Sequence, residues 1–86
     1  MSVPPHQVIL GEFTKLLRRI CEHDEMELAA GTLLDDIPGI DSLRLLQAVA
    51  HLEDHFHVEI DTAALADLRR VRDVLNAVSR ARPLPR

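Results

Sequence analysis

One serine of the chain, Ser42, lies where its hydroxyl could do chemistry. It occupies the segment GIDSL, residues 39–43, between an acidic stretch that contains Pro38 and a long apolar run with helical spacing. A hydroxyl at such a junction of loop and helix can cap the helix, attack a substrate as a nucleophile, or carry a covalently attached group. Each of these roles would give the protein a different function.

The residues around the serine disfavour the nucleophile. A nucleophilic serine needs a positioned base and an oxyanion site, and the nucleophile elbow has the pattern Gly-x-Ser-x-Gly after a strand. Here Gly39 has the wrong spacing, no strand is predicted before it, and nothing in the sequence holds a histidine against Ser42. We therefore do not expect the protein to be a hydrolase.

The cap and the attachment point both remain possible roles. Asp41 and Ser42 are both favourable helix caps, so one of the two exceeds what a cap requires. The N-terminus of a helix presents unpaired N–H groups and the positive end of the helix dipole, which together stabilise a phosphate. A phosphodiester on Ser42 would therefore be tolerated in spite of the acidic surroundings.

The spacing of apolar residues predicts three main helices and one short helix around this junction. They are expected over residues 6–22, 42–56, 61–68 and 71–81, the third being the short one. The second helix has the clearest pattern, a stripe formed by Leu45, Val49, Leu52 and Phe56. Because no segment shows β periodicity, the predicted fold class is all-α, a small four-helix bundle.

The connection between the first two helices, residues 23–41, is unusually long for so small a protein, which indicates a functional role. Isolated apolar residues are expected to anchor it, namely Leu28, Leu33, Leu34, Ile37 and Ile40. The domain is expected to occupy residues 1–81. Residues 82–86 have no apolar face and are predicted to form a flexible tail.

The charge of the 86-residue chain is unevenly distributed. Its net charge is −4, but residues 22–61 hold eleven acids against one base, Arg44. An acidic middle disfavours nucleic acid and suits a protein partner with a basic patch. No apolar run is long enough to span a bilayer and no secretory signal is recognisable, so we expect a cytoplasmic monomer without membrane contact. The single cysteine, Cys21, is expected to be a small buried residue.

Residues 35–60, DDIPGIDSLRLLQAVAHLEDHFHVEI, resemble the core of the acyl carrier protein family. The signature of that family is an Asp-Ser-Leu at the start of the second helix, which corresponds here to residues 41–43. The stripe of the second helix and an F-x-V-x-I pattern ending at Ile60 accompany the signature. With the order of helices and loop, the resemblance covers residues 6–80.

The resemblance implies that Ser42 carries 4'-phosphopantetheine, transferred from coenzyme A by a separate phosphopantetheinyl transferase. The protein would then be a carrier and not an enzyme, and it would hold acyl groups as thioesters on the thiol of this arm. Acyl-activating, synthase or acyltransferase enzymes would act on them. Gly39 would let the backbone turn closely before the serine, Asp41 would help Mg²⁺ or basic partner residues find the site, and Leu43 would border it.

The second helix is also the expected partner-docking element. The expected docking residues are Leu43, Arg44, Leu46, Gln47, Glu53 and Asp54. In family members that serve bulk fatty acid synthesis this face is acidic, whereas here Arg44 and Gln47 occupy two early positions. The departure favours a dedicated carrier for a specialised fatty acid, lipid or polyketide pathway. Two alternatives remain, an aryl or peptidyl carrier of non-ribosomal peptide type and an unmodified helical interaction module.

Three histidines on or near the second helix raise the possibility of a metal site. His51 and His55 are four residues apart and His57 follows closely. No further ligand has an evident reason to converge with them, so no metal site is expected. A second hypothesis is pH-sensitive docking, because histidine titrates near about 6.5 and its protonation would weaken the acidic face.

Overall fold

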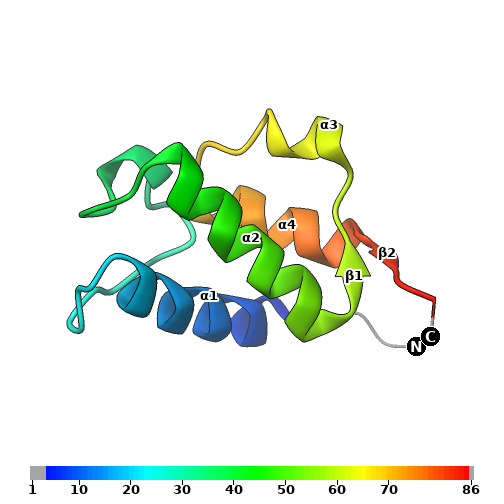
Figure 1. Ribbon diagram of the computed structural model, residues 1–86, viewed down its shortest axis with the longest axis horizontal. Helices are drawn as coiled ribbons and strands as arrows, with labels where there is room; N and C mark the ends of the chain where they lie inside the picture. Colours follow the sequence, from blue (N-terminus) through cyan, green and yellow to red (C-terminus); the bar gives the residue numbers. More distant parts are fainter. Residues whose placement is uncertain (1–3, 86) are drawn as a thin grey trace.

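Three amphipathic helices, α1 (His6–Ile20), α2 (Ser42–Phe56) and α4 (Val71–Arg80), enclose the core of the protein. The computed structural model describes residues 4–85 and adds a short helix, α3 (Thr62–Leu65), and a 3₁₀ turn, η1 (Leu34–Asp36). Figure 1 shows α2 crossing in front of α4, with α1 along one side and α3 at the opposite edge. The predicted all-α bundle is confirmed. In the part of the chain described, no helix has the length and apolarity to cross a membrane.

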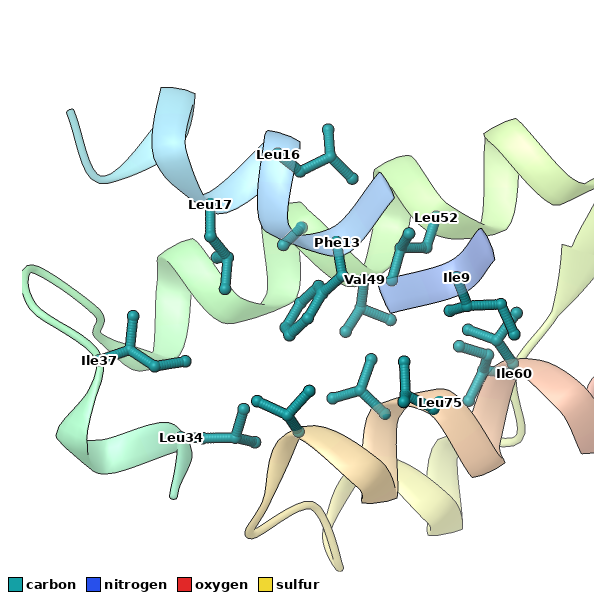
Figure 2. Close-up of a cluster of buried hydrophobic side chains, with 14 of the residues drawn as sticks. Ile9, Phe13, Leu16, Leu17, Leu34, Ile37, Val49, Leu52, Ile60 and Leu75 are labelled. Atoms are coloured by element: carbon teal, nitrogen blue, oxygen red, sulfur yellow. The ribbon is translucent and has the colours of Figure 1, made fainter. Parts of the chain in front are cut away.

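The core is built from the apolar faces of the three long helices. Figure 2 shows Ile9 and Phe13 of α1 projecting toward Val49 of α2 and Leu75 of α4. Phe13 is the largest of the fully buried side chains. Of the predicted stripe on α2, Val49 and Leu52 are buried, whereas Leu45 and Phe56 are only partly buried. Ala48 is the third buried residue of α2, so the buried face of this helix is centred on residues 48–52.

The long connection before α2 is fixed to the core by side chains and backbone. Leu34 and Ile37 are buried as predicted and point into the cluster in Figure 2, and Met26 is a buried anchor that the sequence did not predict. The prediction for Leu33 is wrong, because its side chain is 38% exposed. Its backbone instead forms a β-bridge with Arg70, which ties the connection to the residue before α4.

Residues 82–84, which were predicted to belong to a flexible tail, form backbone hydrogen bonds with the segment that follows α2. Strand β2 (Arg82–Pro83) pairs in antiparallel fashion with β1 (Val58–Glu59), and the backbone N–H of Leu84 donates to the carbonyl of His57 at 2.9 Å. The pairing satisfies backbone groups at the end of α2, where His57 turns the chain in a left-handed conformation. The tail thus closes one end of the bundle, as the red segment of Figure 1 shows.

Two helices end two or more residues earlier than predicted. Helix α1 ends at Ile20 rather than near residue 22, because Glu22 takes a left-handed conformation with φ of 53° that no α-helix continues. Helix α3 ends at Leu65 rather than at Leu68. It contains no fully buried residue, and a helix this short depends on tertiary packing for its stability.

The start of α4 provides a test of local stability. The carboxylate of Asp73 accepts hydrogen bonds from the backbone N–H groups of Arg69 at 3.0 Å and Arg70 at 2.8 Å. The bond from Arg70, followed by that from Arg69, lowers the pKa of Asp73 below its ordinary value of 3.8. Because the folded-state pKa is lowered, the carboxylate stabilises the fold above about pH 4, and this contribution is lost as the pH falls through the lowered pKa.

We therefore expect Asp73→Asn to lower the free energy of unfolding at pH 7 by about 1 kcal/mol. The difference in free energy of unfolding between the two proteins should shrink toward zero as the pH falls below the lowered pKa of Asp73. Urea denaturation of both proteins at neutral and acidic pH measures this. Equal stability of the two proteins at pH 7 would contradict the capping role.

Candidate functional site

The hydroxyl of Ser42 stands free at the first residue of α2. Asp41 is the helix cap, since its Oδ1 accepts the backbone N–H of Arg44 at 2.7 Å and its carbonyl accepts that of Leu45 at 2.9 Å. Ser42 is exposed, and its hydroxyl forms no hydrogen bond with any residue between 4 and 85. Of the two possible caps, Asp41 takes that role, so the serine hydroxyl is available for other chemistry.

A tight turn precedes the serine and depends on Gly39. Gly39 has a φ of +78°, a conformation that residues with a side chain rarely adopt. A Cβ at this position would also lie 3.3 Å from the Cβ of Cys21 at the end of α1. Glycine thus permits the turn, and it also permits a close approach to α1 that the sequence did not predict.

A surface pocket adjoins Ser42 at the junction of the connection and α2. Its lining combines apolar and acidic side chains, namely Leu34, Asp35, Ile40, Asp41, Ser42 and Leu45. Of these lining residues, only Asp41 and Ser42 were predicted to belong to the site, because only the fold of the connection brings η1 beside the start of α2. The carboxylates of Asp35 and Asp41 make the lining of this pocket acidic.

The residues present fit a covalently bound phosphate ester. The hydroxyl that would bear the ester is exposed and unbonded, and the N-terminus of a 15-residue helix lies directly behind it. The free N–H groups and dipole of that helix end would stabilise the negative charge of the phosphate.

Two leucines form an exposed apolar edge beside the serine. Leu43 is 65% exposed and Leu46 is 51% exposed, and both lie in the first two turns of α2. Gln47 is also exposed and lies one residue further along. Exposed large apolar residues that cluster in this way indicate a contact surface more often than isolated ones do.

Two of the six expected docking residues form hydrogen bonds within the protein. Nη1 of Arg44 donates to the carbonyl of Gly39 at 2.6 Å, and Oε2 of Glu53 accepts the backbone N–H of Ile60 at 2.9 Å. Asp54, in contrast, is exposed. The structure therefore separates the expected docking set into an exposed group and a pair with structural contacts.

The histidines of α2 lie apart from the serine. His51 and His55 line a pocket between α1 and α2, where Nδ1 of His55 is 3.9 Å from Oε2 of Glu12. Within residues 4–85 there is no group of three potential ligands that could hold a metal ion. Histidine-dependent docking stays a prediction.

Cys21 is half-buried rather than fully buried as predicted. Burial raises the pKa of its thiol, and the nearby charge of Arg44 acts in the opposite direction. A thiol with a raised pKa is a weak nucleophile at neutral pH. This agrees with a packing role for Cys21 against Gly39.

Comparisons with known proteins place these features in a family context. Residues 12–78 match the family model described as a phosphopantetheine attachment site. A 37-residue stretch is 43% identical to an acyl carrier protein homolog of Mycoplasmopsis pulmonis and covers 43% of this chain. The chain spans about half (51%) of the length of that curated relative.

A solved structure is similar in fold as well. The solution NMR structure of a holo acyl carrier protein from Geobacter metallireducens matches with a TM-score of 0.69 at 28% sequence identity. The match covers 80% of this chain and 79% of the other.

Proposed function

Because the chain belongs to the phosphopantetheine attachment-site family, as its sequence predicts, we propose that it is an acyl carrier protein modified at Ser42. Proteins of this family are carriers and not catalysts, and their cofactor is a covalently attached 4'-phosphopantetheine. When bound, this group supplies a thiol at the end of a flexible arm, on which acyl groups are held as thioesters.

The observation that carries the proposal is the division of roles between Asp41 and Ser42. Asp41 caps α2 through its 2.7 Å bond to the N–H of Arg44, so that modification of Ser42 removes no hydrogen bond from the fold. In the modification, Oγ of Ser42 forms a bond to the phosphorus on the pantetheine side of coenzyme A. The pyrophosphate P–O bond breaks, adenosine 3',5'-bisphosphate leaves, and the hydroxyl proton passes to a base of the transferase.

Intact-mass spectrometry after incubation with coenzyme A, Mg²⁺ and a broad-specificity phosphopantetheinyl transferase tests the proposal. We expect a single addition with the mass of one phosphopantetheinyl group. An unchanged mass, with a known carrier protein modified in a parallel reaction, would contradict it.

The proposed docking surface consists of Leu43, Leu46, Gln47 and Asp54 on α2. Its centre is apolar, because Leu43 and Leu46 are exposed and Gln47 carries no charge. Such a face fits partner enzymes with an apolar contact surface beside their catalytic entrance. It supports a carrier dedicated to a specialised fatty acid, lipid or polyketide pathway, in which synthase, acyl-activating or acyltransferase enzymes are the partners.

Leu46→Ser is expected to weaken docking without unfolding the protein. Because the residues that matter most lie at the centre of an interface, we expect a loss of about 1.4 kcal/mol of binding free energy, which corresponds to a tenfold rise in the KM of the transferase for the carrier. Val8→Ser is the matched control, because Val8 is 49% exposed but lies on α1. Equal KM values for the two variants would argue against a docking surface on α2.

A further inference from the structure

Three arginines from different parts of the chain hold the connection between α1 and α2. Each donates a side-chain hydrogen bond to a backbone carbonyl of that connection. Nε of Arg18 donates to Met26 at 2.7 Å, and Nη1 of Arg70 donates to Gly31 at 2.7 Å. The third is the 2.6 Å bond from Arg44 to Gly39. The connection thus has fixed backbone positions along its length, although little of it is helical.

The bond of Arg44 differs from the other two because it closes the turn that leads into the serine. Gly39 lies three residues before Ser42, and Arg44 lies two residues after it. The backbone N–H of Arg44 is bonded to Asp41 at 2.7 Å, while its side chain reaches back to Gly39. One residue therefore holds the segment before Ser42 at two points.

Two groups also lie close to the turn at Gly39. The position that a Cβ of Gly39 would occupy is 3.3 Å from the Cβ of Cys21 and 3.5 Å from Nη1 of Arg44. The end of α1 and the guanidinium of Arg44 therefore both lie close to Gly39, and together they limit movement of the turn. Loss of the guanidinium would remove one of these two restraints from Gly39, and glycine has the widest backbone freedom of all residues.

We propose that Arg44 is a positioning residue for the modification of Ser42, rather than a docking residue for partners. The inference rests on the proposed function, since it concerns the same serine. By holding the turn over residues 39–41, Arg44 fixes the direction in which the Ser42 hydroxyl leaves the helix. A nucleophile displaced by about 1 Å from its productive position loses on the order of 10²-fold in rate, so a looser turn lowers the rate of transfer.

The experiment compares Arg44→Gln, Arg44→Lys and the wild type as substrates of a phosphopantetheinyl transferase. We expect Arg44→Gln to lower kcat about tenfold while KM changes by less than about twofold. Arg44→Lys keeps a donor that can reach a carbonyl, so it should recover part of the loss. Arg70→Gln is the matched control, because it removes the same type of bond, to Gly31, at a distance from the serine, and should leave kcat unchanged.

Amide hydrogen exchange of the unmodified proteins gives a readout that does not depend on the transferase. Exchange over residues 39–43 should be faster in Arg44→Gln than in the wild type, with the core of α1 and α4 unchanged. If Arg44→Gln raises KM and leaves kcat constant, Arg44 is a docking residue and the inference is wrong. A wild-type kcat in Arg44→Gln, or unchanged exchange over residues 39–43, would also overturn the inference. If the wild type itself is not modified, the proposed function fails and the inference fails with it. If the wild type is modified and Arg44→Gln behaves like it, the proposed function stands and only the role of Arg44 is contradicted.

Discussion

Replacement of Ser42 by alanine is expected to abolish phosphopantetheinylation completely and to leave the stability of the fold almost unchanged. The hydroxyl is the proposed attachment atom, and alanine offers no oxygen for the ester. The same hydroxyl makes no hydrogen bond with the described residues, because Asp41 caps the helix. The free energy of unfolding should therefore change by less than about 0.5 kcal/mol. Intact mass after transferase treatment and urea denaturation measure the two effects.

Ser79→Ala is the matched control for this experiment. Oγ of Ser79 donates to the carbonyl of Leu75 at 2.9 Å within α4, so this serine has a structural contact and no place in the proposed site. The control should be modified to the same extent as the wild type. A mass addition that persists in Ser42→Ala would contradict the assignment, as would a large loss of stability, since the latter would give the serine a structural role.

Phe13→Ala is expected to have the largest effect on stability. The ring is fully buried between α1, α2 and α4, and its removal leaves a cavity that the surrounding helices cannot fill. Substitutions of this kind lower the free energy of unfolding by about 3–5 kcal/mol. The total for a native protein is about 5–15 kcal/mol, so the loss is a large part of it. Urea denaturation followed by circular dichroism measures the loss.

The matched control is Phe56→Ala, at the end of α2. Phe56 is only partly buried, and its ring meets that of His55 edge to face with centroids 4.7 Å apart. We expect it to cost clearly less than Phe13→Ala, because part of the ring is already in water. Equal losses for the two variants would contradict the position of the core given by the structure.

Local signals in the sequence were sufficient to predict α2 and its relation to the site. The cap residue Asp41 and the apolar spacing that follows it define both ends of the helix, and the structure begins it at Ser42 and ends it at Phe56. The turn at Gly39 was predictable for the same reason, since glycine beside a helix start indicates a conformation that other residues avoid.

Features that depend on distant partners could not be predicted in this way. The tail has no apolar face, so nothing in residues 82–85 indicates that Arg82 pairs with Glu59. The exposure of Leu33 follows from a backbone bridge to Arg70, which lies 37 positions further along the chain. Arg44 was predicted to be a docking residue because a charged side chain on the polar face of a helix is usually available to a partner. In the structure its side chain instead donates a hydrogen bond to the carbonyl of Gly39.

Fragmentation mass spectrometry of the wild-type protein after transferase treatment tests the central claim most directly. The chain is digested, and the peptide that carries the added phosphopantetheinyl group is sequenced. We predict that the group is found on the peptide containing residues 39–43, with Ser42 as the modified residue. A group attached to any other residue, or the absence of a modified peptide, would contradict the account.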